Sequence, residues 1–158
     1  MAIEEKLRDK LRDGKLTIAV AESCTGGLLG SRITDVAGSS DYFLGGVIAY
    51  QNEVKEALLR VPHDVIEAHG AVSAQTAEAM ARGCRDLFKC DIAVSITGIA
   101  GPGGGSDEKP VGLTYIGLST ARGVISRRFL WDGSRTQNKE ASVRAAMEMV
   151  LAMLKSPT

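Results

Sequence analysis

The stretch LTIAVAESCTGG, residues 16–27, predicts a buried β-strand that runs through a tight turn into a helix. Residues 16–21 form a compact apolar run that is too short to indicate a helix. Past the glycines, apolar residues recur at helical spacing at Leu29, Ile33 and Val36. Strand, turn and helix start therefore meet at Ser23, where unpaired backbone N–H groups and the positive end of the helix dipole can stabilise an oxyanion or hold a phosphate.

The residues on either side of this stretch predict further helices and a second strand. Before it, residues 3–11 carry an apolar residue at every fourth position, and Gly14 follows as a helix stop. After it, residues 45–50 predict a strand. Residues 52–59 predict a helix that ends before Pro62, because the residue preceding a proline avoids helical geometry.

The middle of the chain contains a regular helical pattern followed by a glycine-rich loop. Residues 73–88 keep their apolar side chains at a 3.6-residue period, and Ser73 is placed to cap this helix. Residues 91–97 predict a third strand, which runs into TGIAGPGGGS, residues 97–106. This glycine density excludes regular structure and is typical of a functional loop.

The last part of the chain predicts a β-hairpin and a closing helix. Residues 111–120 and 124–131 flank a short turn, as the strands of an antiparallel hairpin do. Ser134 and Gln137 fit a capping box, and apolar residues follow along one helical face. The mixed order of elements predicts a single α/β domain over residues 1–158, folded as a layered α/β/α sandwich with a mixed sheet of about five strands.

Composition restricts the classes of protein that this chain can belong to. Its 158 residues are 44% hydrophobic and 24% charged, which suits one globular domain with a core. Lysine plus arginine equals aspartate plus glutamate at 19 each, so no overall field favours nucleic acid or an anionic membrane. Three cysteines without a C-x-x-C pair indicate a reducing compartment, and we expect a cytoplasmic protein. Two histidines and scattered cysteines predict no metal site.

A serine nucleophile needs a base, and the candidates in the sequence are Lys55 and two histidines. Lys55 can serve if burial or a nearby positive charge lowers its pKa enough for a neutral amine to exist near pH 7. His63 and His69 are the alternatives. Cys24 competes as the nucleophile, because a helix N-terminus lowers the pKa of a thiol. Each residue also has an ordinary structural interpretation: Ser23 can cap the helix, Lys55 can be solvated, and Cys24 can be an inert buried thiol.

Other residues can complete a site for a nucleotide. Tyr50 and Asn52 lie where a strand end meets a helix start and can orient the lysine or a substrate amide. The loop at residues 97–106 offers consecutive backbone donors, as anion-binding nests and oxyanion holes do. It matches neither a P-loop nor the dinucleotide-binding glycine fingerprint. Arg135 and Lys139, near the start of the last helix, can meet a substrate phosphate.

Four sequence blocks, taken in order, resemble the CinA C-terminal domain family. They are AESCTGG at 21–27, YQNEVK at 50–55, HGAVS at 69–73 and TGIAGP at 97–102. KPVG at 109–112 extends them at a family-like distance. Together these blocks are very specific, and the resemblance spans nearly the whole chain.

The resemblance implies a nicotinamide mononucleotide deamidase. Such an enzyme hydrolyses the carboxamide to give nicotinate mononucleotide and ammonia in bacterial pyridine-nucleotide recycling. The resemblance implies no metal and no cofactor. It implies a small nucleotide substrate as the partner, and not nucleic acid or a membrane. Family members commonly form homo-oligomers. Longer relatives carry an additional N-terminal domain, so this chain resembles the stand-alone form.

The resemblance also assigns roles to individual residues. By matching position, Ser23 would attack the amide carbon, Lys55 would take its proton, and Tyr50 and Thr97 would orient the lysine or relay protons. Contacts with the substrate or its oxyanion would come from Thr25, Gly26, Gly27, Asn52, Gly98 and Arg135.

The sequence departs from the family at the start of the last helix. Relatives tend to have Gly-Asp-Arg there, with a second arginine four residues further on. This chain has Gly-Ser-Arg at 133–135 and Lys139. Arg135 is therefore present, whereas the second arginine is replaced.

Two other classes of function stay open from sequence alone. A non-catalytic nucleotide-binding or regulatory module would use the same backbone donors to hold a phosphate without breaking a bond. The family's name also suggests a role linked to competence or DNA damage, which the balanced charge and 4% aromatic content do not favour. The presence of Lys55 and Tyr50 distinguishes a catalytic function from a binding function, because hydroxyl activation needs a base and phosphate binding does not.

Overall fold

Five strands form one mixed sheet in the computed structural model, which describes residues 1–155. The strand order is β2-β1-β3-β4-β5. β1 pairs in parallel with both β2 and β3, whereas the β3–β4 and β4–β5 pairs are antiparallel. The mixed five-stranded sheet predicted from sequence is thus confirmed. The bounds are β1 Ile18–Glu22, β2 Phe43–Ile48, β3 Ile92–Gly98, β4 Leu113–Thr120 and β5 Gly123–Leu130.

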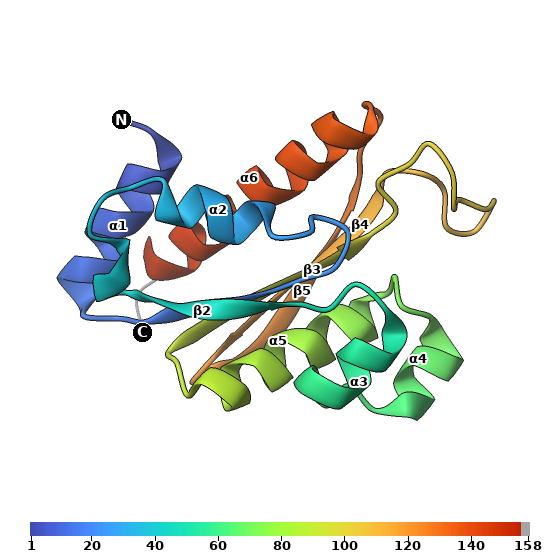
Figure 1. The fold of residues 1–158 in the computed structure, drawn as a ribbon, viewed down its shortest axis with the longest axis horizontal. Helices are drawn as coiled ribbons and strands as arrows, with labels where there is room; N and C mark the ends of the chain where they lie inside the picture. The colour runs from blue at the N-terminus through green and yellow to red at the C-terminus, as the bar shows by residue number, and fades with distance from the viewer. Residues whose placement is uncertain (156–158) are drawn as a thin grey trace.

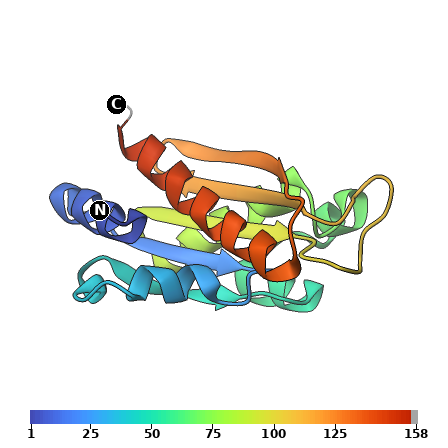
Figure 2. The ribbon, with the colours of Figure 1, turned by 90° about the horizontal axis from the view of Figure 1, so that it is seen from above.

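Helices cover both faces of this sheet and complete the α/β/α sandwich. One layer holds α1 (Ile3–Gly14), α2 (Leu28–Thr34) and α6 (Arg135–Lys155). The other holds α3 (Asn52–Leu59), α4 (His63–His69) and α5 (Ala74–Phe88). Figure 1 shows the sheet between the two layers, and Figure 2 shows α6 crossing the upper face beside α1 and α2. A single 3₁₀ turn, Ser39–Asp41, leads from α2 towards β2.

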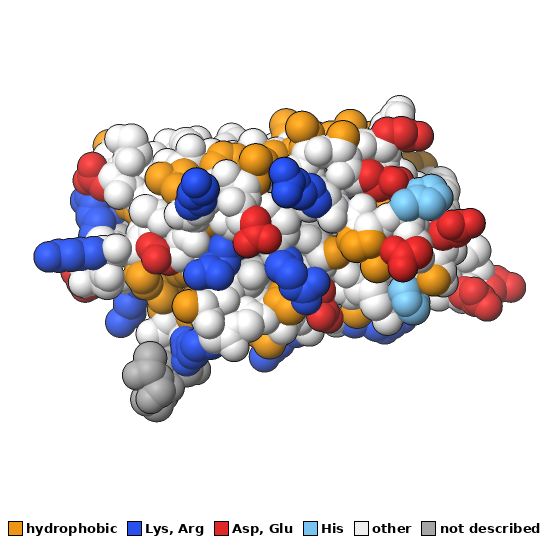
Figure 3. Space-filling model, turned by 90° about the horizontal axis from the view of Figure 1, so that it is seen from below, with side chains coloured by type: hydrophobic (Ala, Val, Ile, Leu, Met, Phe, Trp, Pro, Cys, Tyr) orange, Lys and Arg blue, Asp and Glu red, His pale blue; other side chains and the backbone are white. Residues whose placement is uncertain are grey.

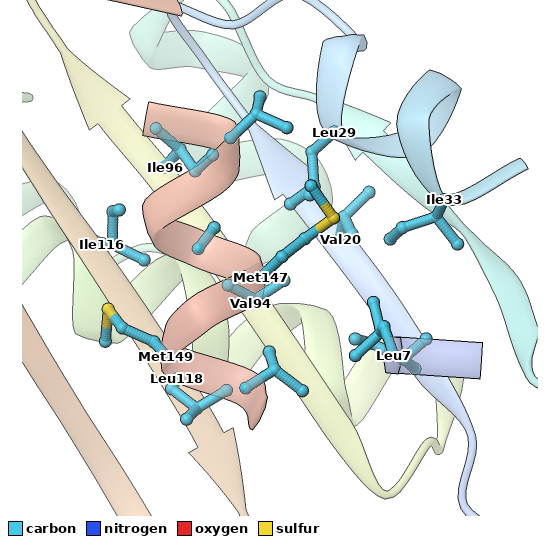
Figure 4. Close-up of a cluster of buried hydrophobic side chains, with 14 of the residues drawn as sticks. Leu7, Val20, Leu29, Ile33, Val94, Ile96, Ile116, Leu118, Met147 and Met149 are labelled. Atoms are coloured by element: carbon cyan, nitrogen blue, oxygen red, sulfur yellow. The ribbon is translucent and has the colours of Figure 1, made fainter. Parts of the chain in front are cut away.

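The sheet separates two hydrophobic cores, because strand side chains alternate between its faces. The larger core lies under α1, α2 and α6, where Leu7, Ile33 and Met147 pack on Val20 and Val94 (Figure 4). The smaller core lies on the other face, under α3 and α5. All five residues of β1 are buried, as expected for a central strand covered on both faces.

The face formed by α3, α4 and α5 is shown in Figure 3. Lysine and arginine side chains are scattered over it among hydrophobic ones and do not gather into one patch. No helix within residues 1–155 has both the length and the apolarity needed to span a membrane.

The structure confirms the two helix caps that were predicted. The Ser73 hydroxyl accepts the Thr76 N–H at 3.1 Å at the start of α5. At the start of α6, the Ser134 N–H donates to Gln137 Oε1 at 2.9 Å and the Gln137 N–H donates to Ser134 Oγ at 3.2 Å. This reciprocal pair is a capping box.

Several element boundaries differ from prediction. β1 begins two residues later and ends one residue later than predicted, because the Thr17 N–H bonds the Asp91 side chain and pairing with β2 and β3 begins at Ile18. β4 begins at Leu113 instead of residue 111, since Gly112 turns at a φ of 93° with its N–H on the Ile99 carbonyl.

β3 and β5 differ from prediction by one residue at each end, and larger differences concern β2, α1 and α4. β2 covers Phe43–Ile48 rather than residues 45–50, which places Tyr50 beyond the strand. α1 ends with Lys15 in the left-handed conformation, so Gly14 is its last helical residue and not the stop. α4 has no buried residue, and the lack of an apolar stripe explains why the sequence pattern did not predict it.

We expect Gly83→Ala to destabilise the protein, because Gly83 lies where α5 crosses the end of α3. A Cβ there would come within 1.7 Å of the Leu59 carbonyl oxygen. Alanine is favoured over glycine by about 1 kcal/mol of helix propensity. Overpacking against backbone costs about 1–3 kcal/mol, and this cost should exceed the gain in propensity because the two helices must move apart. Urea unfolding would measure the change. Gly103→Ala is the matched control, because its Cβ would meet nothing within 4 Å; equal stabilities for the two variants would contradict this prediction.

Candidate active site

The carboxyl ends of three parallel strands converge on one pocket. Ser23 follows β1, Tyr50 follows β2 by two residues, and Thr97 lies in the last turn of β3. In the sheet, β2 lies on one side of β1 and β3 lies on the other. The connections after β1 and β2 therefore run in opposite directions, and such a reversal opens a crevice at the carboxyl ends of the strands. The pocket has a volume of about 260 Å³. It is lined by Ser23, Cys24, Tyr50, Asn52, Lys55, Ala71, Val72, Thr97, Gly98, Ile99, Ala100, Gly101, Gly103, Gly104 and Arg135.

Ser23 and Lys55 meet at the bottom of this pocket. Lys55 Nζ lies 3.0 Å from Ser23 Oγ, although 32 residues separate the two in sequence. The Ser23 N–H donates to the Ile96 carbonyl at 3.0 Å, which fixes the serine backbone against β3. Lys55 projects from the first turns of α3 and is only 1% exposed. The structure thus brings together the serine and the lysine that the sequence singled out.

The other contacts of Lys55 define what its amine can do. Nζ also lies 2.9 Å from the Ala49 carbonyl oxygen and 3.0 Å from the Tyr50 carbonyl oxygen. Carbonyl oxygens only accept, and a neutral lysine amine has two N–H groups and one lone pair. In the ammonium form Nζ donates to Ser23 Oγ, whereas in the neutral form, with both N–H groups on the carbonyls, the lone pair can accept from the Ser23 hydroxyl. Burial lowers the pKa of Lys55 below its ordinary value, which favours this neutral form.

The histidines lie away from Ser23. His63 is highly exposed, and its Nδ1 contacts the Glu56 carboxylate at 3.1 and 3.2 Å. The His69 backbone carbonyl accepts from Lys109 Nζ, and neither histidine lines the pocket. Of the alternative bases, the geometry therefore favours Lys55.

Cys24 also lines the pocket but is buried among core residues. Burial, with a smaller contribution from the nearby Glu22 carboxylate, raises the pKa of its thiol to about 11. The thiolate is the nucleophilic form of cysteine, so little of it is present near neutral pH. The expectation that a helix N-terminus would activate this thiol is not met.

Cys24→Ala is expected to retain catalytic activity within about threefold, because a thiol with so high a pKa is a poor nucleophile near pH 7. Steady-state hydrolysis rates of the variant and the wild type would measure this. Iodoacetamide treatment of the wild type offers an independent check, since Cys24 should react slowly. A large loss of activity in Cys24→Ala would reinstate the cysteine as a nucleophile.

Tyr50 and Thr97 contact the site in different ways. The Tyr50 carbonyl accepts from Lys55, while the residue as a whole is 57% exposed and its hydroxyl accepts from Arg135 Nη2 at 3.3 Å. Thr97 Oγ1 donates to the Ala71 carbonyl at 2.8 Å. Tyr50 thus holds the lysine through its backbone, and Thr97 ties β3 to the segment that precedes α5.

The glycine loop after β3 is held from both helical layers. Arg135 Nη1 donates to the Gly101 carbonyl at 2.8 Å, and Asn138 Nδ2 donates to the Ala100 carbonyl at 3.0 Å. From the other layer, Lys109 Nζ reaches the His69 carbonyl. These bonds fix the loop wall of the pocket. The buried Asn138 was missed from sequence, because an asparagine inside an amphipathic helix gives no distinct signal.

The sequence predicted unpaired backbone N–H groups at the turn between β1 and α2, but the structure pairs several of them. Glu22 Oε1 accepts the Leu29 N–H and Glu22 Oε2 accepts the Gly30 N–H, each at 2.9 Å. The Gly26 N–H donates to the Ser23 carbonyl at 3.1 Å. These donors are satisfied within the protein and are not free for an oxyanion or a phosphate, because the Glu22 carboxylate accepts two of them and the Ser23 carbonyl accepts the third.

The remaining predicted site residues divide between the pocket and this turn. Asn52 and Gly98 line the pocket, whereas Thr25, Gly26 and Gly27 do not. Thr25 Oγ1 instead donates to Glu22 Oε1 at 2.6 Å. Lys139 lies outside the pocket lining. Within the described residues, histidine, cysteine, aspartate and glutamate side chains form no group of three or more that could hold a metal ion.

The fold and the pocket define a class of protein: a single-domain α/β sandwich with a buried serine–lysine pair at the ends of its parallel strands. The chain belongs to the CinA C-terminal domain family, whose model matches residues 1–154. A relative called "CinA-like protein" from Chlorobaculum tepidum is 51% identical over 98% of this chain and 38% of its own length. The chain thus spans well under half of such curated relatives.

Solved structures match the chain over most of its length. A competence/damage inducible protein CihA from Agrobacterium tumefaciens is 42% identical, with a TM-score of 0.91 over 98% of this chain and 96% of its own. A competence or damage-inducible protein from Enterobacter asburiae is 31% identical, with a TM-score of 0.93 over 97% and 96%. These likenesses confirm the family resemblance read from the sequence.

Proposed function

We propose that the chain is an amidohydrolase that converts nicotinamide mononucleotide to nicotinate mononucleotide and ammonia. The observation that carries this proposal is the buried Lys55 amine at 3.0 Å from Ser23 Oγ, with its two N–H groups matched by two carbonyl acceptors. A lysine base beside a serine is an arrangement for acyl transfer. Membership of the CinA family supports the pyridine nucleotide as substrate through the family resemblance.

The chemistry follows from the two side chains. The Ser23 hydroxyl attacks the carboxamide carbon while neutral Lys55 takes its proton. The resulting ammonium returns the proton to the departing nitrogen, so that ammonia leaves and an acyl-serine ester remains. Lys55 then takes a proton from water, and the hydroxide attacks the ester. The Lys55 ammonium returns the proton to Ser23 Oγ as the acyl group leaves, and the released acid loses its proton to give the carboxylate product. Backbone N–H groups in the glycine loop are the donors proposed for the oxyanion.

The phosphate end of the substrate is assigned to the mouth of the pocket. Arg135 lies there, and a guanidinium suits a phosphate because it offers several donors in one plane. Two of its nitrogens already contact Gly101 and Tyr50, which orients the side chain across the mouth. Gly103 and Gly104 add a lining without side-chain obstruction.

Arg135→Ala is expected to raise KM for nicotinamide mononucleotide about tenfold or more, since a lost charge-assisted hydrogen bond is worth about 1.5–3 kcal/mol. The nucleoside, which lacks the phosphate, should be a poor substrate for the wild type and should be little affected by the substitution. Steady-state kinetics on both compounds would measure this. Equal losses on nucleotide and nucleoside would show that Arg135 supports the loop and does not bind phosphate.

The proposed reaction is tested by incubating the purified protein with a panel of pyridine nucleotides and their nucleosides and measuring released ammonia. Release from nicotinamide mononucleotide, with nicotinate mononucleotide as co-product, supports the proposal. Tight binding of the nucleotide without ammonia release would overturn it in favour of a non-catalytic nucleotide-binding module.

A further inference from the structure

The residue before Ser23 is a buried carboxylate that the proposed chemistry does not use. Glu22 ends β1 and is 1% exposed. Its two oxygens accept three hydrogen bonds, from Thr25 Oγ1 at 2.6 Å and from the Leu29 and Gly30 N–H groups at 2.9 Å. All three donors lie in the segment that immediately follows Ser23.

Burying a carboxylate is unfavourable unless donors replace the water that it loses. Here the backbone of the first turn of α2 and one hydroxyl provide them. The negative charge also lies at the positive end of the α2 dipole, where it is favoured. Glu22 is thus well satisfied, but an uncharged core residue would have avoided the cost of burial altogether.

The contacts of Glu22 close the turn that carries Ser23. On one side, Ser23 N–H is bonded to the Ile96 carbonyl of β3. On the other side, Glu22 holds Thr25 and the start of α2, and the Gly26 N–H returns to the Ser23 carbonyl. Ser23 therefore lies between two fixed points. These bonds hold the backbone of Ser23, and its hydroxyl oxygen lies 3.0 Å from Lys55 Nζ.

We propose that Glu22 is a positioning residue, which holds the Ser23–Gly27 turn so that the Ser23 hydroxyl stays within reach of the Lys55 amine. This inference rests on the nucleophilic role of Ser23 in the proposed function, but not on the identity of the amide. Glu22 touches no reacting atom in this account and acts through the turn alone.

The test measures how fast Ser23 reacts with a fluorophosphonate probe, a readout that needs no natural substrate. Serine Oγ attacks phosphorus, fluoride leaves, and Lys55 takes the hydroxyl proton. Glu22→Gln keeps the size of the side chain but replaces one acceptor oxygen by an N–H donor facing the turn. We expect its labelling rate to fall by about tenfold or more, because a displacement of about 1 Å can cost about a hundredfold.

The matched control is Ile33→Ala, in α2, whose apolar side chain is as buried as that of Glu22 but cannot hydrogen-bond to it. It should lower the thermal midpoint while keeping the labelling rate within about twofold. Thr25→Val is a second variant, which keeps the carboxylate and removes one donor, and it should give a smaller loss than Glu22→Gln. The pH midpoint of labelling should stay close to that of the wild type in Glu22→Gln, because burial is the main cause of the lowered pKa of Lys55 and this substitution keeps Lys55 buried.

Slow labelling in folded Glu22→Gln, with normal labelling in Ile33→Ala, supports the positioning role. Wild-type labelling rates in both Glu22→Gln and Thr25→Val would overturn it, as would an equal loss in Ile33→Ala, since that would indicate stability alone. If the wild type labels at Ser23 but releases no ammonia from nicotinamide mononucleotide, the proposed substrate fails while the role of Glu22 can still be judged. A wild type that does not label at Ser23 would overturn the inference.

Discussion

Replacing Ser23 with alanine is expected to reduce kcat for amide hydrolysis by about a thousandfold or more. The hydroxyl is the atom proposed to form the acyl intermediate, and removal of a nucleophile of this kind leaves only binding and oxyanion stabilisation. Binding of nicotinamide mononucleotide should change little, because Ser23 contributes one small group at the bottom of the pocket. Ammonia release and isothermal titration calorimetry would measure the two effects separately.

The fold should survive this substitution. Alanine keeps the backbone, so the bond from the residue 23 N–H to Ile96 remains, and Lys55 retains its contacts with Ala49 and Tyr50. A circular dichroism melt close to that of the wild type would establish this. Full activity in folded Ser23→Ala would eliminate the serine as nucleophile and with it the mechanism proposed above.

Lys55→Met is expected to lower kcat by about a hundredfold to ten-thousandfold, the usual contribution of a general base. Methionine has a similar length and an apolar tip, so it suits a site that is 1% exposed. It cannot accept the serine proton. Lys10→Met, on the exposed side of α1, is the matched control and should keep its activity within about twofold.

The pH dependence gives an independent test of Lys55. Only the neutral amine accepts a proton, so kcat/KM should be low at acid pH and rise through the pKa of Lys55. Burial lowers that pKa below 10.5, so the rise should be centred below 10.5. Lys55→Met should lose this rise and keep a flat, low profile. The base assignment fails if Lys55→Met retains both the wild-type rate and the wild-type pH profile.

Much of the architecture could be predicted because the sequence pattern and the tertiary packing agree. The compact run around Ile18 and the stripe along α5 are buried in the structure as their patterns require. The displaced ends of β1 and β2 could not be predicted, because they are set by contacts distant in sequence. The Thr17 N–H bonds Asp91, 74 residues away, and no local pattern carries that information.

Most of the predicted site residues line the pocket, but Thr25, Gly26 and Gly27 do not, and the contacts that support the site from within were not predicted. Ser23 could be singled out because its hydroxyl lies at a strand-to-helix turn, whereas its pairing with Lys55 instead of a histidine came from the family resemblance. Glu22 was passed over, because an acidic residue near a helix start is usually a solvated charge. Only the three-dimensional structure shows that Glu22 is buried and uses the N–H groups that had been expected to bind substrate.

The same buried lysine makes the folded protein a weaker proton acceptor than its unfolded chain. Where the pKa of Lys55 is lowered by folding, the native state binds fewer protons than the denatured state between that pKa and 10.5. The contribution of this residue to stability therefore rises with pH across that interval and is least favourable at acid pH, where folding must desolvate an ammonium ion. Burial of the proposed base therefore lowers the stability of the folded protein, and this destabilisation decreases as the pH rises.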